Sequence, residues 1–393
     1  MPKTRKILTV AGILAAAGAL LAVTGFFTGA KSMVSFGENG ITIADYSGQA
    51  ATVQKGIKLD HFTSVDGEVD YANVSFVPSD HFGADVAYYG KKPEITVSGG
   101  TLKITQTRKT WGEINLFLRA GNTPKVDTIT VYYPEGTQMD CFNMTDENGS
   151  LSATGFHVRN MAVTCQYGGL ELKNLGAEHL KATLGNGNMK ISDSTAGDVQ
   201  VKNSYGSTSF SSVQISEKMT VSASNGSVNM DGCKVQSLSI SDNYGSVSLS
   251  SLSAENLNTS LGDGNLEITD SETGNTQVKN SYGSVKTSGL STSSLNIQCG
   301  NGSISLKGRL TGKTVLHSDY GSILVQTSLP KDQYGCDCST DYGKVTVDGR
   351  QYRRGVSILS DAKNSLSVST GNGDIAVTFS AKTAENSQAE RKA

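Results

Sequence analysis

The sequence predicts an all-β fold: a single-stranded β-solenoid of coils of about 19 residues, preceded by one N-terminal transmembrane helix and a β-rich cap. Three observations predict it. Glycine is abundant, at 44 of 393 residues, whereas proline occurs only 6 times. A Tyr-Gly or Asn-Gly turn returns at a fixed spacing over much of the chain. A short strand-like segment with alternating polar and apolar residues follows each turn.

The spacing of the turns defines the repeat. The last glycine of each turn recurs every 19 residues, with one step of 20, and two looser returns follow at Gly343 and Gly373. A fixed period of this length is typical of stacked repeats. The glycines in strict register are Gly149, Gly168, Gly187, Gly206, Gly226, Gly245, Gly264, Gly283, Gly302 and Gly321.

Apolar residues keep fixed distances from these glycines. They lie two and four residues after the glycine and five and seven residues before it, as Leu170, Leu172, Val163 and Met161 do around Gly168. Mostly Ser, Asn, Glu, Lys or Thr separate them. This alternation predicts two strands per coil, each with one buried face. A further apolar residue often marks a corner seven residues after the glycine, at Phe156, Leu175, Val213, Cys233, Leu252 and Leu290.

One coil cannot fold alone. It buries about five apolar side chains at about 1.5–3 kcal/mol each, whereas ordering each of its residues costs about 1–2 kcal/mol. Stacking pairs each strand with neighbouring coils and closes a continuous core. At about 4.8 Å per coil, the regular part should form a rod roughly 50 Å long.

The residue before the recurring glycine alternates along the array. It is Tyr at Tyr167, Tyr205, Tyr244, Tyr282 and Tyr320, and Asn or Asp in the coils between. Two residues earlier the pattern inverts: Leu184 and Leu261 occur in the Asn or Asp coils, and Asn203 and Asn280 in the Tyr coils. We interpret this as one large side chain per corner, placed alternately, with a coil pair as the structural repeat.

The N-terminus has the features of a membrane anchor. Lys3, Arg5 and Lys6 precede an uncharged run of 21 residues, Ile7 to Phe27. That length spans a bilayer as a helix, and the basic flank predicts a cytoplasmic N-terminus. The expected location is therefore the cell membrane, single-pass, with the solenoid extracellular. A cleaved signal peptide is the alternative, because small residues end the segment at 28–30.

The chain divides into four predicted regions: the cytoplasmic N-terminus with its anchor or signal peptide (1–31), a β-rich cap (32–140), the solenoid (141–379) and a polar tail (380–393). Strands are suggested in the cap at 40–43, 73–77, 94–97, 101–104, 114–118 and 127–133, without a clear period. A hairpin turn is expected at Ser98-Gly99-Gly100. The single tryptophan, Trp111, is expected to anchor the cap core.

The composition and the spacing of reactive residues give little support to nucleic-acid binding, metal binding or catalysis. Charged residues are 18% with a net charge of −2, which argues against nucleic acid as a partner. Cys336 and Cys338 form a Cys-x-Cys pair, but both fall on inward positions and read as small buried residues. Gly185–Asn188 and Gly262–Asn265 resemble calcium-binding repeats only faintly. We predict no metal, no cofactor and no catalytic residue, and therefore no enzyme. The sequence specifies no oligomeric state.

The array becomes irregular near its C-terminal end. Extra residues occur at 330–335 and 349–354. Insertions in a solenoid usually form loops, and loops often carry binding residues. Arg350, Tyr352, Arg353 and Arg354 are therefore candidate ligand-binding residues for an anionic envelope polymer or lipid headgroup, with a solvated loop as the simpler reading.

With these features placed, the chain resembles the DUF4097 family of adhesin-like, β-strand repeat proteins over roughly residues 55 to 380. The resemblance lies in the anchor, in 74–80 (VSFVPSD), in 131–136 (VYYPEG) and in the repeated Gly-Ser-Val/Ile-x-Leu units. It implies a cell-surface role and supplies no catalytic residues.

The leading hypothesis is a membrane-anchored adhesin or binding scaffold at the cell surface. Its partners beyond the membrane would be envelope polymer, lipid or a surface protein. The alternatives are a sensor or regulator of envelope stress and, less well supported, a polysaccharide-active β-helix enzyme.

Overall fold

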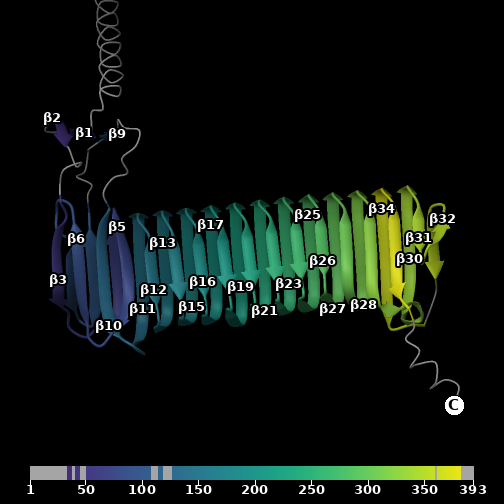
Figure 1. Cartoon of the computed structure of the whole chain (residues 1–393), viewed down its shortest axis with the longest axis horizontal. Coiled ribbons are helices and arrows are strands. Elements are labelled where there is room, and N and C mark those ends of the chain that lie inside the picture. The colour runs from purple at the N-terminus through teal and green to yellow at the C-terminus, as the bar shows by residue number, and fades with distance from the viewer. Residues whose placement is uncertain are drawn as a thin grey trace, which may run out of the picture.

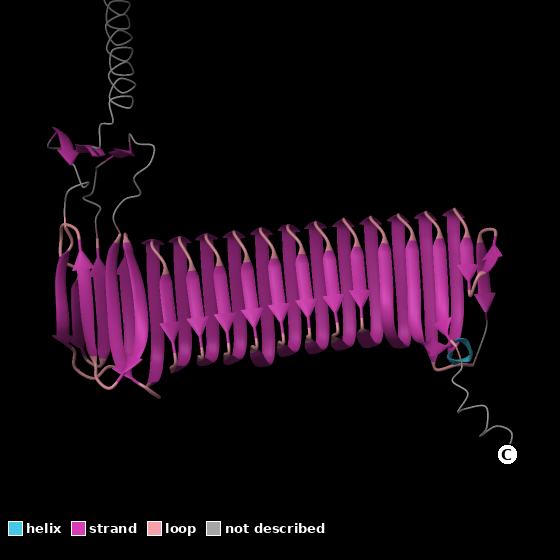
Figure 2. Cartoon of the chain, in the orientation of Figure 1, coloured by secondary structure: helices cyan, strands magenta, loops and turns pink. Residues whose placement is uncertain are grey.

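The computed structural model describes residues 33–37, 40–44, 50–107, 114–117, 126–358 and 361–381. The chain forms an elongated β-solenoid (Figure 1) built almost entirely of strands (Figure 2). This confirms the all-β solenoid. The expected anchor (1–31), Trp111 and residues 382–393 of the expected tail lie outside the described residues. In the described ranges, no helix has the length and apolar character needed to span a membrane.

Each regular coil contains one long and one short strand. Each long strand pairs in parallel with the long strands of the coils on either side, so Met161 lies between Phe142 and Leu180. The long strands are β11 (Gln138–Asn148), β13 (His157–Tyr167), β15 (Gly176–Asn186), β17 (Thr195–Tyr205), β19 (Gln214–Asn225), β21 (Lys234–Tyr244), β23 (Ser253–Asp263), β25 (Glu272–Tyr282) and β27 (Leu290–Asn301).

The short strands stack in the same way, with Leu170 between Leu151 and Met189. They are β12 (Leu151–Thr154), β14 (Leu170–Lys173), β16 (Met189–Ser192), β18 (Thr208–Ser211), β20 (Val228–Asp231), β22 (Val247–Ser250), β24 (Leu266–Thr269) and β26 (Val285–Ser288). Together the two stacks satisfy the backbone hydrogen bonds of every inner coil.

The core follows the predicted inward positions. Every residue two and four after a recurring glycine, and five and seven before it, is buried, including the threonines that replace apolar residues there. The six predicted corner residues are buried as well. The sequence pattern missed one further inward position, two residues beyond that corner, which is buried at Val158, Ile215 and Val235. The long strand therefore bends, and the coil has a short third side.

The recurring glycines are required because neighbouring coils approach too closely at this corner. A Cβ atom built on Gly187 would lie 1.8 Å from the carbonyl oxygen of Gly168. The other corner demands a different backbone. Asn174, Asp193, Ser212, Ser251 and Asp270 occupy the left-handed region there, with φ of 45° to 54°. Short polar residues tolerate that region better than bulky ones.

The interpretation of the Tyr/Asn alternation as shared corner volume is wrong. The tyrosines are exposed, whereas the residues two positions earlier are buried, so the two sets lie on opposite sides of the backbone. Buried Asn203 instead donates from Nδ2 to the carbonyl oxygens of Gly187 (3.2 Å) and Gly206 (3.1 Å). Asn280 and Ser318 donate to the carbonyl oxygens of Gly264 and Gly302 in the same way. Asn203, Asn280 and Ser318 therefore satisfy carbonyl oxygens of the close-packed corner from the interior of the solenoid.

At the N-terminal end, the solenoid contains coils formed by residues that precede the regular sequence repeat. β4 (Ser64–Val69) pairs in parallel with β11, and β5 (Ala72–Ser79) with β12. A second coil, β8 (Thr101–Gln106) and β10 (Asp127–Pro134), lies outside the first although it follows it in sequence. The antiparallel strands β3 (Thr52–Lys58), β6 (Gly83–Tyr88) and β7 (Glu94–Ser98) close this end.

Two smaller features complete this region. The hairpin predicted at Ser98-Gly99-Gly100 is confirmed, because it joins β7 and β8 with Ser98 opposite Thr101. Three further strands form a separate antiparallel sheet: β1 (Met33–Gly37), β2 (Gly40–Ala44) and β9 (Ile114–Phe117).

At the C-terminal end, the last coil in the sequence is not the last in space. β28 (Ile304–Tyr320) and β29 (Ile323–Pro330) pair with β34 (Asn364–Asn372) and β35 (Ile375–Ser380). The other side of β34 and β35 pairs with β30 (Tyr334–Tyr342) and β31 (Val345–Val347), which precede them in sequence. In Figure 1, β34 accordingly lies between β28 and β30. A 3-10 turn, η1 (Lys331–Gln333), leads into β30.

Candidate binding surface

The four candidate residues near the C-terminus lie on strands and a tight bend, not on a loop as expected. β32 (Arg350–Tyr352) pairs antiparallel with β31, with Tyr352 opposite Val345. Asp348 and Gly349, both at positive φ, form the two-residue turn of this hairpin. β33 (Gly355–Ile358) then pairs antiparallel with β30. The insertion therefore covers the end of the parallel stack.

Their side chains are placed unequally. Tyr352 is half-buried and packs against the core, and the Arg350 guanidinium lies over its ring at 5.3 Å from the centroid. Arg353 and Arg354 are exposed, and the Arg354 carbonyl accepts a hydrogen bond from the Thr340 N–H. Charged side chains on an edge strand discourage pairing with another chain. This role accounts for the arginines without a ligand, and ligand binding by these four residues stays a prediction.

A second surface was not singled out as a site by the sequence pattern. Six tyrosines that precede recurring glycines are 56% to 73% exposed. Within the described residues, every exposed large aromatic side chain belongs to this set: Tyr167, Tyr205, Tyr244, Tyr282, Tyr320 and Tyr342. We call this set the tyrosine row. The sequence does contain a signal for this surface. Each tyrosine stands in a turn, next to glycine and polar residues, where a side chain is usually exposed to solvent.

The tyrosine row follows one corner of the solenoid and alternates with amides or a carboxylate. Strand register places the residues in this spatial order: Tyr167, Asn186, Tyr205, Asn225, Tyr244, Asp263, Tyr282, Asn301, Tyr320, Asn372 and Tyr342. In sequence order Tyr342 would follow Tyr320 directly. The inserted coil places Asn372 between them and preserves the alternation.

The backbone that carries the row is held from coil to coil. The N–H of Gly187 donates to the carbonyl oxygen of Tyr205 at 2.8 Å, and that of Gly206 donates to Asn225 at 2.9 Å. Equivalent bonds fix Tyr167, Tyr282, Tyr320 and Tyr342. The spacing of the tyrosines is therefore set by the strand spacing, at about 9.6 Å for every second coil.

The family of the chain is established by direct comparison. The family model described as DUF4097, Toastrack DUF4097, matches residues 68–217 and 212–378. The chain belongs to the DUF4097 (Toastrack) family. No curated protein matches it.

Solved structures similar to this Toastrack chain share little sequence with it. One is described as a "putative lipid binding protein" from Parabacteroides distasonis, with 16% identity over 67% of this chain and 95% of that one, and a TM-score of 0.31. Another is a "putative adhesin" from Parabacteroides merdae, with 12% identity over 69% and 97% and a TM-score of 0.28. A third is a "putative cell adhesion protein" from Clostridium sporogenes, with 10% identity over 84% and 100% and a TM-score of 0.17.

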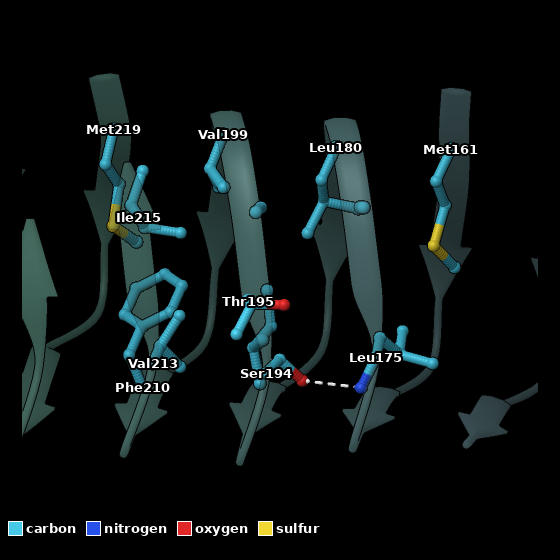
Figure 3. Close-up of a pocket in the computed structure, with 13 residues that line it drawn as sticks. Met161, Leu175, Leu180, Ser194, Thr195, Val199, Phe210, Val213, Ile215 and Met219 are labelled. Atoms are coloured by element: carbon cyan, nitrogen blue, oxygen red, sulfur yellow. Dashed lines mark hydrogen bonds between the residues drawn. The ribbon is translucent and has the colours of Figure 1, made fainter. Parts of the chain in front are cut away.

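Of two hollows in the described part of this Toastrack protein, neither is both enclosed and large enough for a ligand. The core void in Figure 3 has a volume of about 10 Å³ and lies among apolar side chains such as Phe210 and Met219. Ser194 there accepts a hydrogen bond from the Leu175 N–H at 3.1 Å. A shallow hollow of about 500 Å³ opens on the outer face of β13 to β19, where His179 lies 3.5 Å from Asp198.

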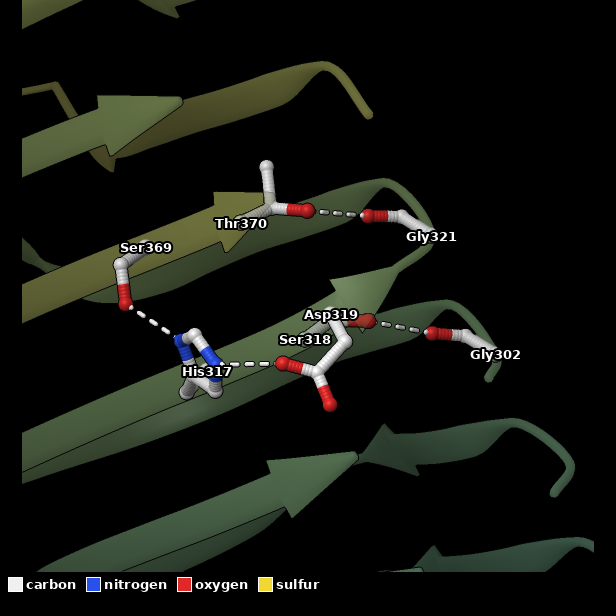
Figure 4. Close-up of polar contacts among 7 residues, drawn as sticks. All are labelled: Gly302, His317, Ser318, Asp319, Gly321, Ser369 and Thr370. Atoms are coloured by element: carbon white, nitrogen blue, oxygen red, sulfur yellow. Dashed lines mark hydrogen bonds and ion pairs between the residues drawn. The ribbon is translucent and has the colours of Figure 1, made fainter. Parts of the chain in front are cut away.

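One contact has the residue types of a hydrolytic triad. His317 Nδ1 lies 2.8 Å from Ser369 Oγ, and His317 Nε2 lies 3.0 Å from Asp319 Oδ1 (Figure 4). All three side chains are on the exposed outer face, and neither of the hollows described above adjoins them. A catalytic serine also needs donors for the developing oxyanion, and a flat sheet surface uses its N–H groups in strand pairing. This contact does not support an enzyme.

The cysteines also behave as interior residues. The five predicted inside, Cys165, Cys233, Cys299, Cys336 and Cys338, are all buried. Burial raises the pKa of the Cys165 thiol to about 12, which disfavours the reactive thiolate. In the parts of the chain that the structure describes, no group of three or more His, Cys, Asp or Glu residues is placed to hold a metal ion.

Proposed function

We propose that this protein is a membrane-anchored binding scaffold of the cell surface, with the solenoid displayed outside the membrane. The observation that carries the binding role is the tyrosine row: six exposed aromatic side chains on a rigid corner. Exposed aromatic residues gathered in one place usually mark an interaction site. The basic and apolar N-terminal sequence supports the anchoring.

A long rod suits this role better than it suits catalysis. Its core is filled, its outer strand positions are mostly Ser, Thr and Asn, and its repeated geometry offers the same surface many times. Repeated weak contacts on a rigid support give high avidity without any deep site. The arginine-bearing C-terminal end is a second surface for an anionic partner.

Two experiments test the proposal. In the first, the purified full-length protein is mixed with isolated cell envelopes, anionic lipid vesicles or host matrix, and the bound fraction is measured by sedimentation. Saturable binding to one of these materials is expected, and its absence from all three would overturn the binding role. In the second, protease is added to intact cells. Protection of the solenoid would overturn its extracellular placement.

A further inference from the structure

The tyrosine row has a period as well as a position. Tyrosines occupy every second coil without interruption from Tyr167 to Tyr342, so they repeat at about 9.6 Å over about 48 Å. The inserted coil places Asn372 between Tyr320 and Tyr342, so the tyrosines stay in every second coil. The regular spacing is therefore a property of the order of the coils in space, not of their order in the sequence. A partner that contacts all six rings would itself repeat at this distance.

The surroundings of the rings are polar and almost free of basic residues. From coil to coil, Asn186 and Asn225 lie on either side of Tyr205, and Ser207 and Ser227 follow the corner glycines. From 166–169 to 300–303 the four-residue corners carry one charged residue, Asp263, and the last three corners add Asp319, Asp341, Asp374 and a single basic residue, Lys344. A nucleic acid or an anionic lipid surface would require basic residues here. Aromatic faces alternating with amides and hydroxyls instead suit a ligand with apolar C–H faces and many hydroxyl groups.

We propose that the tyrosine row binds an unbranched β-1,4-linked glycan strand laid along the rod, with every second sugar stacked on a tyrosine ring. In such a strand each sugar is turned over relative to the one before, so equivalent faces return once per disaccharide. The length of that disaccharide is close to two coil spacings. Asn side chains in the intervening coils would donate hydrogen bonds to the sugar hydroxyls and accept others from them, and the Asp263 carboxylate would accept them.

The row is organised for this contact before any ligand arrives. Corner hydrogen bonds of 2.8 to 3.0 Å fix the backbone at five of the six tyrosines, so binding has to order little beyond the side chains. Each ring contributes a weak contact, and contacts made along one strand add through effective concentration. This inference rests on the proposed binding function and names its ligand class.

The test uses the full-length protein and defined oligosaccharides in calorimetry. Chito- and cello-oligosaccharides of increasing length are the probes, and an α-1,4-linked oligosaccharide of equal length is the control for linkage. We expect a hexasaccharide with β-1,4 linkage to bind at least about tenfold more tightly than the disaccharide, and the α-1,4-linked control not to bind. Affinity that does not rise with length, or equal binding of the α-1,4-linked control, would overturn the proposal.

Substitutions show whether binding depends on the tyrosine row or on another part of the surface. Tyr244→Ser with Tyr282→Ser leaves at most two consecutive rings and should reduce the affinity for the hexasaccharide about tenfold or more, whereas the two phenylalanine substitutions should retain it, because stacking needs the ring. Val53→Ser, which removes an exposed apolar side chain from β3 in the N-terminal cover, is the matched control and should bind normally. If the serine variant still binds cell envelopes as the wild type does, the glycan proposal fails while the binding scaffold stands.

Discussion

Tyr320 on β28 lies beside Asn372 on β34, and Tyr342 lies on the far side of Asn372. The coil that comes last in the sequence is therefore inserted between two earlier coils. The N-terminal end uses a related arrangement, in which β8 and β10 lie outside β4 and β5. Antiparallel strands then cover both ends, so that short antiparallel strands, and not the parallel stack, form the outermost edges on which another chain could pair.

A disulfide test distinguishes the inserted coil from stacking in sequence order. Oxidation of the His317→Cys, Ser369→Cys variant should link the two cysteines, because these residues are register partners on adjacent strands about 4.8 Å apart. The matched control is His317→Cys, Ser339→Cys, which would be adjacent only if coils stacked in sequence order. These positions lie two coils apart and should not link. Peptide mapping by mass spectrometry detects the disulfide in each variant. A disulfide in the control variant but not in the first variant would contradict the fold.

Asp242 should make the stability depend on pH. Burial raises its pKa to about 6 from the usual 3.8, and the backbone N–H of Tyr244 offsets only part of this effect. Because the folded pKa is raised, the stabilising contribution is complete below about pH 4 and is lost as pH rises through about 6. Asp242→Asn should remove this loss, since Asn203 and Asn280 in equivalent positions donate to glycine carbonyls.

The expected gain from Asp242→Asn is up to about 3 kcal/mol at pH 7 and close to zero at pH 4. Chemical denaturation at several pH values measures it. Asp263→Asn, at an exposed carboxylate of the next coil, is the control and should leave the pH dependence unchanged. A variant that is less stable than wild type at pH 7 would show that the buried carboxylate is stabilising as an anion.

The glycine at the close corner should not accept even one added carbon. Gly187→Ala is expected to cost about 2–3 kcal/mol, because its Cβ would lie 1.8 Å from the Gly168 carbonyl oxygen. Gly169→Ala is the matched control, since its Cβ would meet its nearest neighbour at an ordinary 3.5 Å. Thermal unfolding should separate the two variants by several degrees, and equal melting temperatures would refute the close approach.

The second corner offers a stabilising change. Ser251 has a φ of 51°, a region that glycine occupies without strain and that Gly232 occupies in the preceding coil. Ser251→Gly should therefore stabilise the protein, by about 0.5–1 kcal/mol. Ser248→Gly, in the neighbouring strand β22, should destabilise it by a similar amount. A loss of stability at both positions would argue against strain at the corner.

Much of the regular array could be predicted because each coil repeats the same constraints. The glycines, the inward residues around Gly168 and the buried Cys336 and Cys338 all follow from one period. The ends could not be predicted in this way, since register there depends on which edge remains unpaired. Val74 and Phe76 belong to a coil, but the recurring glycine is absent and the antiparallel strands β6 and β7 interrupt the chain before the next coil.

The loop expected at the candidate site was wrong for a related reason, whereas ligand binding there stays a prediction. The insertion at Arg350–Arg354 looked like a loop because the spacing broke, whereas antiparallel pairing turns it into the end cover of the rod. The tyrosine row was visible as an alternation, but side-chain exposure was needed to read it as a surface. Tyr342 could join the row only after the position of Asn372 was known.

The spacing of the tyrosine row can be tested without changing the number of tyrosines. Asn225→Tyr combined with Tyr244→Asn moves one ring by one coil and keeps the composition. If the period of the row governs binding, the affinity for a β-1,4-linked octasaccharide, which spans four consecutive rings and so always includes Tyr244, should fall as far as in Tyr244→Asn alone when measured by calorimetry. Affinity equal to that of the wild type would show that the spacing is irrelevant and would contradict the account.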